Sequence, residues 1–169
     1  VAMSSFGHSH HRRDVFPGTG PLGITVIYPF LAELLRQVPA RGTPGAVPAA
    51  AARILSPTAD ATKHPNVCTE WKLYVEPELR RIFESATETV ERDLHTLGGQ
   101  EKPFANGTLP IPTGNSEAWL NALNRARLAL AAKFDFTEAE LCDHYRSPIG
   151  SRRDLSLFQV NFYGFLQEF

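Results

Sequence analysis

The sequence contains few cysteines and no long apolar segment. Cys68 and Cys142 are its only cysteines, and they lie far apart without forming a Cys-x-x-Cys motif. Two reduced thiols in a cytoplasmic protein are therefore the default interpretation. No apolar run reaches the ~18 residues of a membrane span, and the basic residues near the start are not followed by the apolar core of a signal peptide. We expect a cytoplasmic protein without a membrane partner.

The sequence also lacks an excess of either charge. The 17 Lys and Arg residues nearly balance the 18 Asp and Glu residues, which leaves a formal net charge of -1. General nucleic-acid binding draws much of its affinity from basic side chains set against phosphates. We therefore expect no nucleic-acid partner.

Motifs of several common enzymes are missing as well. The chain has no Gly-rich phosphate loop, no Gly-x-Ser-x-Gly and no His-Glu-x-x-His. Cys142 and His144 are close in sequence, with Asp143 between them and Tyr145 after them, but residues two positions apart on a helix do not face each other. No catalytic residue and no cofactor is predicted, and the sequence favours a protein that is not an enzyme.

The composition that remains is that of one globular domain. The hydrophobic fraction is 43% and the charged fraction 21%, both ordinary values. A chain of 169 residues can bury about two-thirds of its unfolded surface, so it needs neither a disulfide nor a metal to fold. Residues 1–21 are rich in Ser, His, Gly and Pro, which predicts a flexible N-terminal arm. Residues 22–169 are expected to form a single helical domain.

Apolar residues recur at helical spacing through most of that domain, which predicts a mostly α fold of about six helices. Pro39 is expected to end the first helix and Pro77 to open the longest one. Residues 99–114 contain several Gly and Pro residues and are predicted to form a loop. The expected core packs helices 77–97, 116–134 and 152–169 together, with helix 29–38 alongside and a short helix at 49–55.

Polar residues mark the expected starts of several helices. Asn66 is predicted to cap a helix through WKLYV that turns Cys68 and Trp71 inward, with Val75 as a further candidate. The segment SRRD, at 151–154, fits a capping box in which the acid stands three residues after the cap. The remaining expected caps are Asn115 or Ser116 and Thr137.

One short segment has the pattern of a strand. GITVIY, at 23–28, alternates its side chains and is rich in β-branched residues. No second strand is evident, so this segment is expected to pair with the N-terminal arm or another subunit, or to be plain extended chain. The runner-up fold is accordingly α+β, with 23–28 in a small hairpin or an intersubunit sheet.

Four segments together resemble a bacterial family known as a domain of unknown function, DUF2017. They are ITVIYPFLAELL, EPELRRIF, AWLNALNRARLALAAKF and the terminal YGFLQE, and the resemblance extends over about 22–169. It implies a mainly helical fold and no known activity. The chain departs from the family pattern at Arg125, where an acidic residue is expected, and at Ala131-Ala132, where a small step containing Gly is expected.

The helix predicted at 116–134 carries the first candidate site. Asn124 and Arg127 flank its apolar face and are expected to be half buried, whereas Asn121 and Arg125 are expected to be solvated. A buried guanidinium needs an anion or several carbonyls to offset its desolvation. The candidate partners are on the last helix, so the predicted binding residues are Asn124, Arg127, Gln167 and Glu168.

These four residues allow two interpretations. They can form a polar clamp that fixes the register of two helices, which is the more common role of a buried arginine with partners. They can also form a pocket in which the fork of Arg127 holds a carboxylate or a phosphate.

The second candidate site is a histidine cluster near the start of the chain. His8, His10 and His11 lie within four residues, and imidazoles so close together can bind Ni²⁺, Cu²⁺ or Zn²⁺. Such tracts are a compositional signal only, and an adventitious affinity is the simpler interpretation.

The function predicted from these features is a non-catalytic protein-interaction or regulatory module. The predicted last helix has a broad apolar face that includes Phe158, Phe162 and Phe165, and this face is expected to dock on a protein partner or a second copy. The alternative is a small-molecule or metal-dependent enzyme with a site near Arg127.

Overall fold

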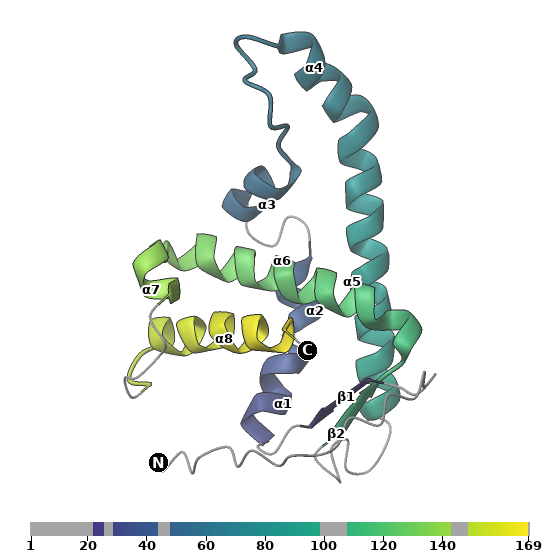
Figure 1. The fold of residues 1–169 in the computed structure, drawn as a ribbon, viewed down its shortest axis with the longest axis vertical. Helices are drawn as coiled ribbons and strands as arrows, with labels where there is room; N and C mark the ends of the chain where they lie inside the picture. Colours follow the sequence, from purple (N-terminus) through teal and green to yellow (C-terminus); the bar gives the residue numbers. More distant parts are fainter. Residues whose placement is uncertain (1–21, 26–28, 44–47, 99–107, 143–148, 169) are drawn as a thin grey trace.

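The computed structural model describes residues 22–25, 29–43, 48–98, 108–142 and 149–168 (Figure 1). The predicted N-terminal arm lies outside these residues, so it stays a prediction. Among the described residues the fold is mostly α, as predicted. The helices are α1 (Pro29–Arg36), α2 (Val38–Gly42), α3 (Pro48–Leu55), α4 (Pro65–Glu70), a π-helical segment (Trp71–Val75), α5 (Glu76–Gly98), a 3-10 turn (Thr113–Asn115), α6 (Ser116–Phe134), α7 (Glu138–Cys142) and α8 (Arg152–Leu166).

The predicted strand is present, but the prediction for its partner was wrong. Strand β1 (Leu22–Thr25) pairs antiparallel with β2 (Thr108–Ile111), with Leu22 opposite Ile111. Strand β2 lies in the segment predicted as a loop. The prediction missed this strand because its TLPI sequence is short and contains a proline, which weakens a strand pattern. The two strands are far apart in sequence, so only the folded chain brings them together (Figure 1).

Two prolines lie inside helical segments rather than at their predicted boundaries. Pro39 does not end the first helix, because a turn at Gln37 leads into α2 with Pro39 in its first turn, where a missing N–H costs little. Pro77 does not open the long helix, since α4, the π-helical segment and α5 form one uninterrupted helical stretch from 65 to 98. The π-turn precedes Pro77, where it can relieve the clash between the proline ring and the preceding turn.

The core lies where α6 crosses the other helices. Helix α6 packs against α8 on one side and against α2, α5 and α3 on the other, which confirms the predicted grouping of the three main helices (Figure 1). The buried cluster also includes residues of α1, so that helix lies alongside as predicted. The largest fully buried side chains are Trp119, Tyr163, Leu34, Leu35, Leu130, Gln159, Val38 and Val90.

One part of the long helix leaves this core. Residues 65–82, here named the projecting helix, extend beyond the bundle beside α3 and the segment that follows it (Figure 1). Of the residues expected to turn inward here, Cys68 is buried and Trp71 is half-buried, whereas the further candidate Val75 is exposed. Burial on α5 becomes complete only from Ala86 and Val90, where the helix reaches α6.

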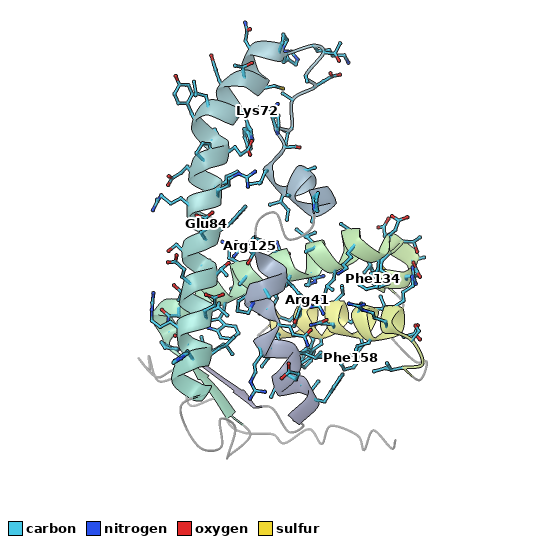
Figure 2. The ribbon with its side chains drawn as sticks, turned by 180° about the vertical axis from the view of Figure 1, so that it is seen from behind. Arg41, Lys72, Glu84, Arg125, Phe134 and Phe158 are labelled. Carbon is cyan, nitrogen blue, oxygen red and sulfur yellow. The ribbon has the colours of Figure 1, made fainter. Side chains whose placement is uncertain are left out.

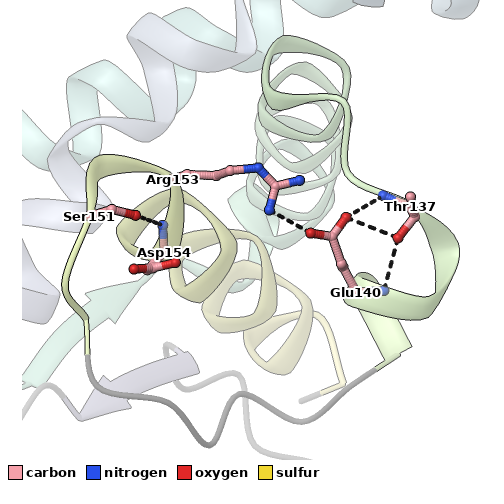
Figure 3. Close-up of polar contacts among 5 residues, drawn as sticks. All are labelled: Thr137, Glu140, Ser151, Arg153 and Asp154. Carbon is pink, nitrogen blue, oxygen red and sulfur yellow. Dashed lines mark hydrogen bonds and ion pairs between the residues drawn. The ribbon is translucent and has the colours of Figure 1, made fainter.

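The predicted helix caps had mixed outcomes. Ser151 accepts a hydrogen bond from the backbone N–H of Asp154, and Thr137 accepts one from the N–H of Glu140 (Figure 3). Asn66 is not a cap, because α4 begins one residue earlier after His64. Asn115 occupies the cap position of α6, but its side chain donates to Asp93 instead.

Candidate functional site

Arg125 of α6 is buried, with 3% of its surface exposed, so the prediction of a solvated side chain was wrong. The prediction assigned α6 a single apolar face, whereas the helix is covered on two sides. Trp119 and Leu130 are buried in the main core, while the small side chains of Ala122 and Ala126 let neighbouring helices approach closely. Arg125 lies next to these small residues and is enclosed with them.

Among the described residues, the guanidinium of Arg125 contacts neutral groups. Its Nη1 donates to the carbonyl oxygen of Gly42 at 2.6 Å, and its Nη2 donates to Thr87 Oγ1 at 3.1 Å. The Cζ atom lies 4.8 Å from the ring centroid of Phe83, a cation–π distance. The Nε atom is buried and has no hydrogen-bond partner among the described residues.

Gly42 makes this arrangement possible. A Cβ at this position would lie 3.1 Å from the carbonyl oxygen of Ala122, so only glycine allows the end of α2 to approach α6 this closely without a shift. The Gly42 carbonyl is at the C-terminal end of α2, where unpaired carbonyls carry partial negative charge. Arg125 therefore caps α2 through its side chain.

Burial has a clear effect on the charge of Arg125. Loss of solvent lowers the pKa of its guanidinium to about 10, and no nearby acid counters this effect. None of the ion pairs among the described residues includes Arg125. The group is thus a cation at neutral pH that is held in a poorly solvated place without an anionic partner.

Arg125 lines a small hollow, here named the Arg125 hollow, that is partly open to solvent. It encloses about 20 Å³, which is enough for one water-sized particle. Its walls come from the end of α2, from α3, from Phe83 on α5 and from α6, and Figure 2 labels the two arginines among them. The polar part of this lining consists of Arg41, Arg125, Thr43 and the backbone of Gly42, without any carboxylate, imidazole or thiol.

Arg41 is held in place by Gln37, which lies between α1 and α2, and Gln37 in turn contacts α8. Its Nε and Nη2 atoms donate to Gln37 Oε1 at 3.2 and 2.8 Å, and the same oxygen accepts from Gln159 Nε2 at 3.3 Å. Gln159 also donates to the hydroxyl of Tyr163, which donates to the Leu34 carbonyl. Burial raises the pKa of Tyr163, so this buried network is neutral apart from Arg41.

The predicted site residues on α6 and at the end of the chain are only partly brought together. Arg127 Nη1 donates to Gln167 Oε1, and Gln167 Nε2 donates to the Leu120 carbonyl at 3.1 Å. Asn124 and Glu168 are exposed, so the expectation that Asn124 is half buried was wrong. The Arg127–Gln167 contact joins α6 to α8, as the polar-clamp interpretation requires.

Gly164 contributes to this contact. A Cβ there would lie 3.2 Å from Cζ of Arg127, so the guanidinium lies close against the backbone of α8. The Arg127 Nε atom is buried and has no partner among the described residues. An anion-binding role for Arg127 stays a prediction.

The remaining candidates lie mostly outside the described residues. His8, His10 and His11 belong to the segment that the structure does not describe, as do Asp143, His144 and Tyr145, while Cys142 is exposed. Over the described ranges, no group of three or more His, Cys, Asp or Glu residues could hold a metal ion. Within the same ranges, no helix has the length and apolar character that crossing a membrane requires.

Sequence reasoning missed Arg41, Gly42, Thr87 and the burial of Arg125. One usable signal was present, because Ala122, Ala126 and Ala129 recur at helical spacing beside Arg125 and mark a second face of close packing. The contribution of Gly42 had no such signal, since it depends on where α2 crosses α6.

Comparison with known proteins gives one result. The family model described as Domain of unknown function (DUF2017) matches residues 28–169. No curated protein and no solved structure matches the chain. The match covers most of the chain and agrees with the resemblance carried by the four segments, so this protein belongs to the DUF2017 family.

Proposed function

We propose that this protein is a non-catalytic protein-interaction module whose contact surface is the projecting helix, residues 65–82. One observation carries the proposal: five large apolar side chains on this helix are solvent-exposed. Exposed apolar side chains that occur together on one element commonly mark protein–protein contacts, and three of these five are consecutive in the helix. The exposed fractions are 50% for Val67, 62% for Leu73, 70% for Tyr74, 36% for Val75 and 41% for Ile82.

The projecting helix has the dimensions and support of an interaction element. Its 18 residues span about 27 Å at the rise of an α-helix. Trp71 Nε1 donates to the Leu55 carbonyl at 2.8 Å, which ties the helix to α3. The ion pairs Arg80–Glu76 and Arg81–Glu78 join residues four and three positions apart, and pairs at these spacings stabilise a helix. The apolar side chains are therefore presented on an ordered scaffold.

The partner that best fits this surface is a second copy of the chain. If two projecting helices run antiparallel about an axis between positions 74 and 75, Val67 faces Ile82 of the partner subunit. Glu70 then comes within one position of both Arg80 and Glu78 of the partner subunit, so its charge is balanced. Lys72 comes within one position of Glu76 and of Glu78 of the partner subunit, which brings opposite charges together.

This proposal relocates the interaction surface predicted from the sequence. The last helix was expected to dock through its phenylalanines, and Phe165 is 51% exposed. Phe158 and Phe162, however, are half-buried, and Phe158 lies 5.8 Å from the ring of Phe30. These side chains cover the edge of the bundle, so the projecting helix is the stronger candidate.

Oligomeric state tests the proposal. We expect size-exclusion chromatography with light scattering to give a dimer for the natural chain and a monomer for Tyr74→Asp and Val75→Asp. Leu128→Asp is the matched control, because Leu128 is a similarly exposed apolar residue on α6. A natural chain that stays monomeric up to its solubility limit, or a control that dissociates equally, contradicts the proposal.

A charge exchange tests the orientation of the two copies. Lys72→Glu alone should weaken the dimer, because it places like charges near Glu76 and Glu78 of the partner subunit. The double variant Lys72→Glu with Glu78→Lys should restore it, since the pair is then reversed, and Glu78→Lys alone measures the effect of losing the exposed Glu78–Arg81 pair within one helix. Failure of the double variant to recover would contradict the antiparallel arrangement.

No specific observation favours the enzymatic alternative. The lining of the Arg125 hollow offers two guanidinium groups and one hydroxyl, but no side chain of the usual proton-transfer types. Arg127 lies outside that lining and is engaged by Gln167.

A further inference from the structure

The Arg125 hollow has an unbalanced charge. Arg125 and Arg41 both line it, and its lining contains no acidic side chain. Two positively charged residues beside one small cavity repel each other, and burial of Arg125 reduces the screening that water would supply. A cavity with this lining is electrostatically suited to a negative charge.

The groups that already contact Arg125 do not supply that charge. They are a backbone carbonyl, a threonine hydroxyl and a phenylalanine ring, all of which are neutral dipoles or quadrupoles. The Nε atom remains buried without a partner, although a guanidinium offers five N–H donors. A buried cation without an opposite charge normally costs several kcal/mol, so its retention at 3% exposure needs an explanation.

Both guanidinium groups are also fixed in place before any ligand arrives. Arg125 is tied to α2 and α5 through Gly42 and Thr87, and Arg41 is tied to Gln37. Preorganised charges lose little conformational entropy on binding, which favours affinity. The apolar walls supplied by Ala50 and Ala51 lower the local dielectric and strengthen the attraction.

We propose that the Arg125 hollow binds one small anion, of the size of chloride or a single carboxylate group, beside Arg125, with Arg41 as a second positively charged residue of the lining. The size follows from the enclosed volume of about 20 Å³. The partial opening to solvent gives such an ion a route of entry. Planar carboxylates suit the fork of a guanidinium especially well. The site is separate from the projecting helix and does not depend on the proposed interaction function.

Thermal unfolding in three sodium salts tests the proposal. The natural chain is heated in chloride, acetate or phosphate, with the ionic strength held constant by isethionate, an anion without a carboxylate whose sulfonate group is bulkier. We expect chloride or acetate to raise Tm saturably, by about 3–6 °C at ten times the dissociation constant. Isothermal titration calorimetry with sodium acetate should give a matching dissociation constant.

Three variants separate the site from general salt effects. Arg125→Gln should abolish the saturable shift and Arg41→Gln should reduce it at least several-fold. Arg152→Gln, which removes one exposed charge on α8, should keep the full shift. If Arg125→Gln does not fold, Arg41→Gln carries the test, because Arg41 is only half-buried and bonds only to Gln37 among the described residues.

Three results overturn the proposal. The first is the absence of any saturable shift in the natural chain with chloride and acetate. The second is an equal shift in the natural chain and in all variants, which indicates general screening by salt. The third is a response to phosphate alone, which contradicts the proposed size of the ligand.

Discussion

Arg125 and Arg127 are two positions apart on α6, and their side chains reach different environments. Arg127 contacts the end of α8 through Gln167, while Arg125 is enclosed by α2 and α5. An arginine at the edge of an apolar stripe has two outcomes, burial with partners or solvation. The choice depends on which helix covers that side, so residue identity alone could not decide it.

Gly42 offers a direct test of the close approach of α2 to α6. Gly42→Ala should lower the free energy of unfolding by about 1–3 kcal/mol, because the added methyl group meets the rigid backbone of Ala122 at 3.1 Å. Gly114→Ala is the control, since a Cβ at Gly114 has no neighbour within 4 Å. Its effect should stay within about 0.5 kcal/mol in chemical denaturation. Equal effects of the two changes would count against the tight contact.

Glu140 predicts a specific pH dependence. Its carboxylate accepts hydrogen bonds from Arg153 and from the N–H and hydroxyl of Thr137 (Figure 3). These contacts, led by the one with Arg153, lower the pKa of Glu140 from 4.5 to about 2. A carboxyl whose pKa is lower in the folded state stabilises the fold above its unfolded pKa and loses that effect as the pH falls.

The corresponding variant is Glu140→Gln. Its Tm should lie below that of the natural chain at neutral pH, and the difference should shrink as the pH falls from about 4.5 to about 2. Calorimetry across this window measures the effect, with Glu138→Gln, an exposed neighbour, as control. A Tm difference that is constant with pH would show that the ionised carboxylate is not responsible.

At the scale of the elements, one acid, Asp93 of α5, makes several hydrogen bonds to the start of α6. Asp93 accepts two hydrogen bonds from Asn115 Nδ2, at 2.9 and 3.0 Å, and one from Trp119 Nε1 at 2.9 Å. Asn115 was expected to cap α6 with its own side chain, and a local sequence rule favours that outcome. Asn115 donates to Asp93 instead, because a charged acceptor on the neighbouring helix makes a stronger hydrogen bond than a neutral one.

Removal of the Asp93 carboxylate should therefore weaken the contact between α5 and α6. We expect Asp93→Ala to lower the free energy of unfolding by about 3 kcal/mol, since it leaves the indole N–H of a nearly fully buried Trp119 without its acceptor. Glu88→Ala, an exposed acid on the same helix, should change it by less than about 0.5 kcal/mol. Urea denaturation measures both, and a loss below about 1 kcal/mol for Asp93→Ala would contradict this role.

The long helical stretch also shows where element boundaries could be predicted. Its existence followed from apolar spacing, and its end at Gly98 lies one residue beyond the predicted end at 97. The predicted start at Pro77 was wrong. A proline is typical of the first turn of a helix, but the π-helical segment before Pro77 lets the helix continue through it. Such a local rearrangement depends on hydrogen bonds that composition does not reveal.

At the scale of the molecule, the projecting helix extends from a well-packed bundle and buries fewer apolar side chains than the rest of the same helical stretch. Residues 65–82 contribute one buried apolar side chain, Cys68, whereas residues 86–94 include Ala86 and Val90 in the core. Local stability follows buried contacts and protected hydrogen bonds. The two halves of one continuous helix should therefore differ in stability.

Hydrogen exchange followed by mass spectrometry measures this difference. Amides of 65–82 should exchange faster than those of 86–94 in dilute solution. If two copies pair through the projecting helix, protection of 65–82 should rise with protein concentration while that of 86–94 stays constant. Uniform protection along the helix at every concentration would contradict both the uneven stability and the pairing.

By itself, the sequence determined the mostly α class, the main helices and the family. These follow from apolar periodicity, from caps such as Ser151 and from four recognisable segments, all of which act over a few neighbouring residues. Only the tertiary structure decided the pairing of β1 with β2, the burial of Arg125 and the exposure of the projecting helix. Each of these depends on contacts between segments far apart in the chain, and local patterns do not specify which segments meet.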